Sequence, residues 1–265
     1  MINEREARRQ IVEVGKWLYN KGLVAATDGN LSIRLGDRII TTPSGVSKGF
    51  LKENELVIVN SKGEKVGGSG KPSTEVKMHL AVYKIRPDVN AVLHAHPPKS
   101  IAFTIAGVSL TQCVIPEVVV TIGAIQTTPY ATPSTDEVVQ SINEPIKHTD
   151  VLMLDRHGSL TVGKDIYSAY MKLEKLEHAA EILIYARLLG NVKTLNKAEV
   201  DKLMELREST YGLSNNILRC DSNQLASGSC SLNNSSSIGS SDISNEELSK
   251  IITQKVIEQL KNDTA

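Results

Sequence analysis

A short apolar run that ends in two histidines constrains the fold more than any other feature of the chain. Residues 89–93 have the length and composition of a buried β-strand, and Pro97 and Pro98 stop it directly after the histidines. In a strand, residues two apart face the same way, so His94 and His96 project from one face at the strand's end. Two imidazoles placed in this way can both bind one metal ion.

Two further residues extend the pair into a candidate metal site. His157 lies in a turn between a second apolar run, residues 151–154, and Gly158. Glu75 follows a Pro-Ser-Thr segment, and three histidines with one exchangeable carboxylate match the ligands of a catalytic zinc ion. A single His-x-His pair is more often structural than metal-binding. The addition of His157 makes metal binding the better interpretation.

The remaining histidines favour other roles. His79 lies four residues after Glu75, on the same face of an expected helix, so packing or support of Glu75 is favoured over ligation. His178 lies within another expected helix, where packing or solvent exposure is favoured, and His148 lies in a loop.

Composition narrows the class of protein. The 265 residues are enough for one large core and an appendage, and 30 basic residues balance 30 acidic ones. No basic surface for nucleic acid or for a membrane is therefore expected, and neither a membrane span nor a secretory signal is seen. The cysteines, Cys113, Cys220 and Cys230, are odd in number and indicate a reducing compartment rather than a disulfide framework. We expect a soluble cytoplasmic protein.

Hydrophobic periodicity predicts an α/β fold. Helices are expected at residues 4–22, 73–85, 100–106, 135–147, 166–189 and 196–209. Strands are expected at residues 30–35, 38–42, 56–60, 89–96, 112–115, 118–122 and 151–154. Strands cluster in the middle and no glycine-rich nucleotide loop is present, so we predict a sandwich with a mixed or largely antiparallel sheet.

The composition changes after residue 213. In residues 222–241, nine of twenty residues are serine and none is charged, which predicts a flexible linker over residues 214–243. A capping box at residues 244–247 then begins an amphipathic helix that runs to residue 262. Its exposed apolar stripe favours docking in a groove or an oligomer over folding back onto its own core, because the linker is long.

Three segments before the first histidine pair have residue types that suit an anion. They combine glycines that allow close backbone approach, hydroxyl and amide donors, and an expected helix start. Their residues are Gly29, Asn30, Ser44, Gly45, Ser73 and Thr74. Each segment alone is weak evidence, but three of them beside a metal site indicate a phosphorylated substrate with a metal-chelating group.

The order of these motifs resembles the class II aldolase/adducin family, and within it the zinc-dependent L-fuculose-1-phosphate aldolases. The motifs are Thr27-Asp28-Gly29-Asn30-Leu31-Ser32, Thr42-Pro43-Ser44-Gly45, Pro72-Ser73-Thr74-Glu75, His94-Ala95-His96-Pro97 and Arg156-His157-Gly158. The resemblance covers about residues 4–213, and it implies that residues 1–213 form the catalytic domain. It also implies an α/β/α sandwich and a homotetramer with active sites between subunits.

The resemblance implies a role for each matching residue. His94, His96 and His157 match the ligands of one Zn²⁺ per subunit, and Glu75 matches a catalytic carboxylate that also approaches the metal. The six residues of the three anion segments match the phosphate-binding positions, and Asn30 also matches a donor to the enediolate. Tyr211 matches a tyrosine that acts near the aldehyde portion from a neighbouring subunit.

The implied reaction is zinc-dependent retro-aldol cleavage of a 6-deoxyketose 1-phosphate, L-fuculose or L-rhamnulose 1-phosphate. The products are dihydroxyacetone phosphate and lactaldehyde. The chain departs from the bacterial fuculose enzymes near residues 114–117, where Glu117 stands and their active-site tyrosine is missing. The alternatives are a pentulose-phosphate 4-epimerase, in which Asp replaces Glu75, or another aldolase or dehydratase of the family. A non-catalytic adducin-like module is disfavoured because all four ligand residues are present.

The C-terminal residues resemble the encapsulation peptides of bacterial microcompartment enzymes, which dock cargo on shell proteins or on other cargo. Such a location suits a reaction that releases a reactive aldehyde. We therefore expect residues 244–262 to place the protein in a microcompartment lumen, and an oligomerisation helix is the alternative.

Overall fold

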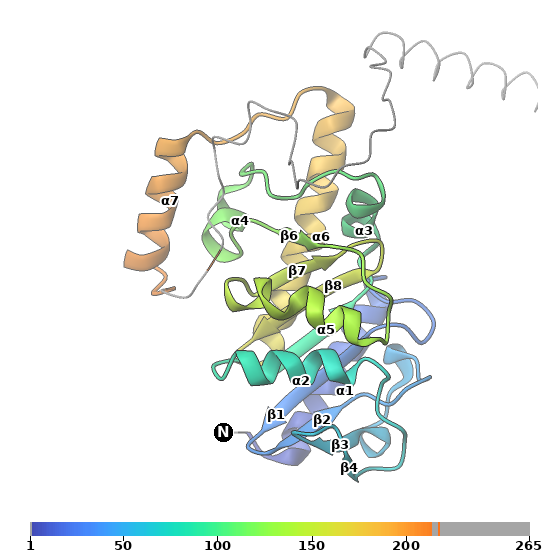
Figure 1. Cartoon of the computed structure of the whole chain (residues 1–265). Coiled ribbons are helices and arrows are strands. Elements are labelled where there is room, and N and C mark those ends of the chain that lie inside the picture. Colours follow the sequence, from blue (N-terminus) through green and yellow to red (C-terminus); the bar gives the residue numbers. More distant parts are fainter. Residues whose placement is uncertain (1, 214–216, 218–265) are drawn as a thin grey trace, which may run out of the picture. The chain divides into compact units, whose positions relative to one another are not determined.

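A single eight-stranded sheet forms the centre of the protein in its computed structural model, which describes residues 2–213 and 217 (Figure 1). The strand order is β4-β3-β2-β1-β5-β8-β7-β6. The strands are β1 (Asn30–Leu35), β2 (Arg38–Thr41), β3 (Val57–Asn60), β4 (Lys65–Gly67), β5 (Ala91–Ala95), β6 (Gln126–Thr128), β7 (Val151–Leu154) and β8 (Gly158–Gly163). Only the β6–β7 pair among them is parallel, which confirms the predicted mixed, largely antiparallel sheet.

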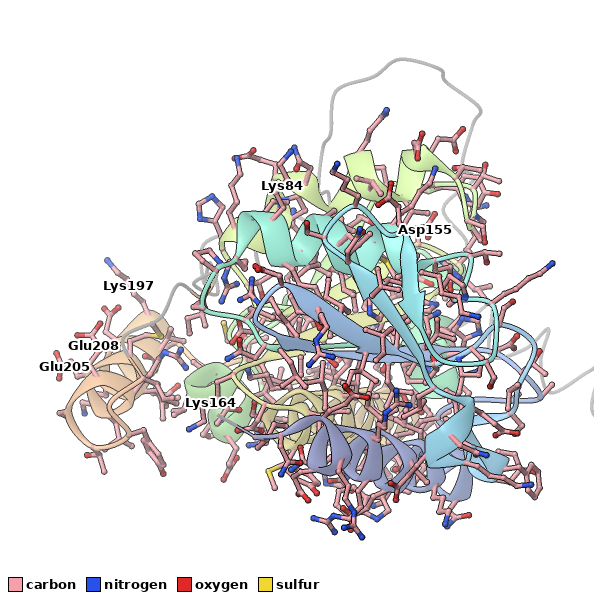
Figure 2. All side chains as sticks on the ribbon, turned by 90° about the horizontal axis from the view of Figure 1, so that it is seen from below. Lys84, Asp155, Lys164, Lys197, Glu205 and Glu208 are labelled. Atoms are coloured by element: carbon pink, nitrogen blue, oxygen red, sulfur yellow. The ribbon has the colours of Figure 1, made fainter. Side chains whose placement is uncertain are left out.

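Helices cover both faces of this sheet, so the fold is a three-layer α/β/α sandwich (Figure 2). Helices α1 (Glu4–Asn20) and α6 (Ile166–Leu189) pack on one face, and α2 (Val76–Ile85) and α5 (Asp136–Asn143) pack on the other. The other helical elements are α3 (Pro98–Ile105), α4 (Pro116–Thr121), α7 (Lys197–Ser209) and the 3-10 turns η1 (Lys48–Phe50), η2 (Glu53–Glu55) and η3 (Pro145–Lys147). Each face of the sheet therefore has its own apolar cluster.

The helices predicted most accurately have both an apolar stripe and a residue that can cap the helix N-terminus. In α1, Ile11, Val14 and Leu18 are fully buried, and the Asn3 side chain accepts a hydrogen bond from the Glu6 backbone. The Asp165 side chain caps α6 in the same way through the backbone of Ser168. The predicted bounds of α6 and of β1 are confirmed.

Two strand predictions are wrong. Residues 116–121 form helix α4 instead of a strand, because Pro116 at the first turn favours a helix start and Val119 packs against α7. Residues 112–115 form no strand in the described structure. Helix α2 begins at Val76, later than predicted, and Glu75 is its N-cap residue. Strands β4, β6 and β8 were not expected from the sequence, since they are short or rich in glycine, serine and threonine.

One expectation about the cysteines is also wrong. Cys113 is buried and disulfide-bonded. The other two cysteines lie outside the described residues, as do the predicted linker over residues 214–243, apart from residue 217, and the predicted helix over residues 244–262. None of the described helices is long and apolar enough to cross a membrane.

A buried carboxylate on α6 holds the segment that follows His96. Glu177 is 7% exposed and accepts hydrogen bonds from the backbone N–H groups of Lys99 and Ser100 and from the Ser100 hydroxyl. These groups lie at the start of α3, where backbone donors have no partner within the helix. Helix α6 therefore anchors the chain directly after the predicted metal ligands.

We predict that Glu177→Gln lowers the free energy of unfolding by about 1–3 kcal/mol, because an amide N–H₂ replaces one acceptor and leaves a buried donor unpaired. Urea unfolding monitored by circular dichroism measures the change. Glu174→Gln is the matched control, since it removes only an exposed ion pair with Lys21. The Glu174 side chain is 42% exposed and the Lys21 side chain is 54% exposed. Equal destabilisation by both substitutions would contradict the capping role of Glu177.

Candidate metal centre and active site

Three imidazoles converge where β5 ends. His94 is the fourth residue of β5, His96 follows the strand, and His157 lies in the turn between β7 and β8. One ring nitrogen of each lies within 4.8 Å of the others, and the Nε2 atoms of His94 and His96 are 3.0 Å apart. The structure therefore brings together the three histidines that the sequence singled out.

The pairing of β5 with β8 produces this convergence. His94 is the register partner of Leu160, and the β7–β8 turn consequently lies beside the end of β5. A Cβ atom on Gly158 would lie 2.5 Å from the Ala95 carbonyl oxygen and 2.8 Å from the His94 ring. Glycine is therefore required here, because any side chain would push the His157 turn away from the other imidazoles.

Glu75 and Asn30 complete the cluster from two other elements. The Glu75 carboxylate lies 3.4 Å from His94 Nε2 through one oxygen and 3.3 Å from His157 Nε2 through the other. Asn30 is the register partner of His94 in the β1–β5 pair, and its Nδ2 donates a 2.8 Å hydrogen bond to Glu75. All four sequence-predicted metal residues thus lie in one site, with Asn30 beside them.

The protein environment keeps His94 and His96 in the form that binds metals. His94 Nδ1 lies 2.9 Å from the Ser159 carbonyl, which can only accept, so Nδ1 carries the proton and Nε2 presents its lone pair. Burial lowers the pKa of His94 to about 3; Glu75 opposes this shift and the neighbouring histidines add to it. The pKa of His96 is lowered as well, chiefly by burial and then by His157.

Glu75 is ionised in the same surroundings. Burial alone would raise its pKa, but the nearby imidazoles of His157 and His94 and the hydrogen bond from Asn30 hold it well below its usual range. Its Oε1 atom is buried and has no hydrogen-bond donor among the described groups. An ionised, buried oxygen beside three imidazole nitrogens is the donor set that zinc prefers, so these residues fit a divalent metal ion.

The first two anion segments lie near this cluster. Gly29 has a φ of +74°, and a Cβ there would lie 2.9 Å from the His94 carbonyl oxygen, so this segment packs directly against β5. The second segment lies beside the third, because Pro43 and Pro72 form an isolated antiparallel β-bridge. Nothing lies within 4 Å of the position that a Cβ of Gly45 would occupy, so that backbone is open to a ligand.

The third anion segment does not begin a helix, contrary to the prediction. Ser73 and Thr74 precede α2 instead of beginning it, and the Ser73 hydroxyl accepts a hydrogen bond from the Glu75 backbone. The Thr74 hydroxyl lies 2.8 Å from the Ser134 hydroxyl, and the Ser44 N–H donates to the Lys71 carbonyl. Several of the donors predicted for an anion therefore already have protein partners.

Two predicted residues are not brought to the cluster within one chain. Tyr211 follows α7, is 57% exposed, and makes no hydrogen bond or ring contact with the other described site residues. Glu117 is exposed in the first turn of α4. His79 is fully buried outside the cluster, with Nδ1 2.6 Å from the Ser32 hydroxyl, whereas His148 and His178 are exposed.

Sequence reasoning missed two charged residues beside the site. Asp28 Oδ2 lies 3.5 Å from His96 Nδ1, and its position next to Gly29 was the available signal. Lys48 is fully buried and lies close enough to Asp28 and Glu75 to interact with both carboxylates. An isolated lysine after a turn resembles an ordinary surface residue, so the sequence carried no signal for it.

Comparisons with known proteins agree with this geometry. Residues 9–184 match the class II aldolase and adducin N-terminal domain. L-fuculose phosphate aldolase from Methanococcus maripaludis is 34% identical over 65% of this chain and 93% of that protein. For 5-deoxy-D-ribulose 1-phosphate aldolase from Bacillus thuringiensis the identity is 31%, over 80% of this chain and 99% of that protein. A solved structure with a similar fold is that of YgbL from Klebsiella pneumoniae, which is suggested to be an aldolase, epimerase or decarboxylase. The two structures superpose with a TM-score of 0.72 and are 29% identical, over 77% of this chain and all of the YgbL chain.

We predict that His96→Ala and His157→Ala each weaken zinc binding at least about 100-fold, since even the loss of a group that only supports a ligand costs about 10–100-fold. Competition with a chromophoric zinc chelator at matched protein concentrations measures the affinity. His178→Ala is the control and should bind zinc like the unaltered protein, because this histidine is exposed on α6. Undiminished zinc affinity in both ligand variants would exclude the imidazole cluster as the metal site.

Proposed function

The chain belongs to the class II aldolase and adducin N-terminal domain family, and from this premise we propose that it is a zinc-dependent aldolase that cleaves a phosphorylated ketose. The observation that carries the proposal is the convergence of three imidazoles and one ionised carboxylate on a single point. A non-catalytic adducin-like module would have no use for this donor set.

The proposed substrate is a 6-deoxyketose 1-phosphate, L-fuculose 1-phosphate or L-rhamnulose 1-phosphate, and the products are dihydroxyacetone phosphate and lactaldehyde. Two observations support this choice. The similar proteins include aldolases named for L-fuculose phosphate and for 5-deoxy-D-ribulose 1-phosphate. The site also combines the metal cluster with segments whose backbone can approach an anion, which suits a ketose that carries its phosphate near the chelating oxygens.

In the proposed mechanism, the ketose is polarised by the metal and side chains of the site move the protons. A zinc ion bound at the cluster would supply Lewis acidity to the carbonyl and adjacent hydroxyl oxygens of the ketose. The hydroxyl on the aldehyde side loses its proton, the neighbouring carbon–carbon bond breaks, and its electron pair passes to the carbon beside the carbonyl. Glu75 is ionised at the start, so it first takes up a proton from water, which balances the proton lost by the hydroxyl, and then delivers it to that carbon. The Asn30 amide donates a hydrogen bond to the enediolate oxygen.

The aldehyde-side proton requires a further group, and Tyr211 is proposed for this role from a neighbouring subunit. Its exposure at the end of α7, apart from the cluster of its own chain, is compatible with such an arrangement. The corresponding assembly is a homotetramer with active sites between subunits. The role of Glu117, which stands where the fuculose enzymes have a tyrosine, is not assigned.

A second candidate reaction uses the same site differently. A pentulose-phosphate 4-epimerase rejoins the two cleavage products, and a dehydratase or decarboxylase removes water or carbon dioxide from a related sugar phosphate. The similarity to YgbL, for which epimerase and decarboxylase activities are also suggested, supports these reactions as the second candidate. They differ from the proposed reaction in their products and can be separated by direct assay.

We predict that zinc-loaded enzyme releases dihydroxyacetone phosphate and lactaldehyde from at least one 6-deoxyketose 1-phosphate. The panel should contain L-fuculose and L-rhamnulose 1-phosphates, 5-deoxy-D-ribulose 1-phosphate, pentulose 5-phosphates and a 3-oxo sugar-acid phosphate, with every product measured. Net epimerisation, dehydration or carbon dioxide release without aldehyde would replace aldol cleavage with one of the alternatives.

Glu75→Gln serves as the internal control for this panel. The amide keeps the size of the carboxylate but cannot carry the proton, so cleavage should fall by about 10²–10⁴-fold while bound zinc persists. Undiminished turnover by this variant would remove Glu75 from the proton-transfer step without affecting the assignment of the substrate.

We also propose that residues 244–262 form an encapsulation peptide that directs the enzyme into the lumen of a bacterial microcompartment. Support comes from the sequence, in which a serine-rich linker precedes a capped amphipathic stripe. The match to the Bacillus thuringiensis aldolase covers nearly all of that protein but only 80% of this chain, so part of this chain has no counterpart there. Confinement of lactaldehyde gives such a segment a chemical purpose.

We predict that Ile252→Asp, in the apolar stripe, abolishes association with purified shell proteins without changing turnover. Pelleting of the enzyme with assembled shells measures association. Gln254→Asp is the matched control, since it places the same charge on the opposite face of the predicted helix. Equal association of both variants with the shells would refute targeting through the stripe.

A further inference from the structure

Lys48 is a buried cation that the proposed reaction does not use. It lies at the start of η1, three residues after Gly45 of the second anion segment, and is 1% exposed. A fully buried lysine is rare, because burial of an ammonium group without a paired charge is costly. The burial of Lys48 therefore calls for a physical reason.

The ammonium group of Lys48 joins two of the anion segments. Its Nζ donates hydrogen bonds of 2.7 Å to the carbonyl oxygens of Thr27 and of Val46. Thr27 precedes the Asp28-Gly29-Asn30 segment, and Val46 follows Gly45 directly. One side chain therefore fixes the relative position of the two stretches of backbone that we assign to the substrate phosphate.

The positive charge of Lys48 is not neutralised by these contacts. Both acceptors are neutral carbonyl groups, and among the described residues no carboxylate lies within ion-pair distance of Nζ. An ammonium has three donors, so one remains without an acceptor in the described part of the chain. Burial lowers the pKa of Lys48 to about 8, and Asp28 and Glu75 oppose that shift, so it stays charged at neutral pH.

The two carboxylates that act on Lys48 from a distance are directed at the imidazole cluster. Asp28 faces His96 at 3.5 Å, and Glu75 faces His94 and His157 at 3.4 and 3.3 Å. Lys48 is therefore left as a cation behind the two anion segments, in a place where low solvent exposure strengthens its field.

We propose that Lys48 is a positioning residue of the phosphate site, which orders the two backbone segments and supplies the positive charge that attracts the dianionic ester. The inference rests on the proposed function for the identity of that site. A purely structural role would need only the two hydrogen bonds, which a neutral amide can also donate. The charge itself distinguishes the two roles.

The test compares Lys48→Met and Lys48→Gln in the full-length, zinc-loaded protein. Methionine matches the length of the apolar stem and is the variant that burial tolerates best. Glutamine keeps N–H donors without the charge. Binding of inorganic phosphate is measured by isothermal titration calorimetry, together with zinc content and the midpoint of thermal unfolding.

Both variants should bind phosphate about 10- to 100-fold more weakly than the unaltered protein, because each loses a charge-assisted interaction. Zinc content should be unchanged, and on an accepted ketose phosphate KM should rise by a similar factor while kcat changes much less. Lys52→Gln is the matched control: this lysine is exposed and four residues away, so the same loss of charge there should leave affinity intact.

The outcomes separate this inference from the proposed function. Undiminished phosphate affinity in either Lys48 variant would overturn the role of the charge while leaving the proposed phosphate site in place. Failure of the unaltered protein to bind phosphate would instead overturn the phosphate site, and the Lys48 inference with it. Loss of affinity in Lys48→Met but not in Lys48→Gln would reduce Lys48 to a structural link between the two segments.

Discussion

The antiparallel pairing of β5 with β8 is the contact on which the rest of the site depends. It sets the end of β5, with its two histidines, beside the β7–β8 turn that carries His157. The approach is so close that no side chain fits at Gly158, where a Cβ would meet the Ala95 carbonyl and both imidazoles of the β5 end. The register of one strand pair and one missing side chain thus determine whether three ring nitrogens can share a ligand.

The surrounding layers hold this arrangement in place and set its charges. Helix α6 anchors the chain after His96 through the buried carboxylate of Glu177, while α2 delivers Glu75 from the opposite face of the sheet. Burial keeps His94 neutral, and the imidazoles in turn keep Glu75 ionised. A site made of imidazole nitrogens and one anionic oxygen is suited to a divalent cation. Lys48 adds a separate positive charge behind the backbone segments assigned to phosphate, so the site has distinct places for a metal and for an anion.

Local signals in the sequence predicted those elements whose stability is itself local. Helices α1 and α6 have N-caps and apolar stripes, and β1 and β7 are apolar runs of strand length, so periodicity and capping were sufficient. Local signals do not suffice where a neighbouring element decides the structure. The valine-rich residues 118–122 have the composition of a strand, yet Pro116 and packing against α7 place residues 116–121 in a helix. Strand β8 contains glycine, serine and threonine and is held in the sheet by β5 and β7 on either side.

The sequence by itself determined which residues can do chemistry: the spacing of His94 and His96 on a strand, a third histidine before a glycine, and a carboxylate beside hydroxyl groups. It also determined the class of fold, because the alternation of apolar and polar residues is a local property. Only the tertiary structure decided that these residues meet, since their approach depends on strand register and on the absence of a Cβ at Gly158. It alone also decided that Lys48 is buried and joins two loops, because burial and pairing belong to the packed chain and leave no pattern in its sequence.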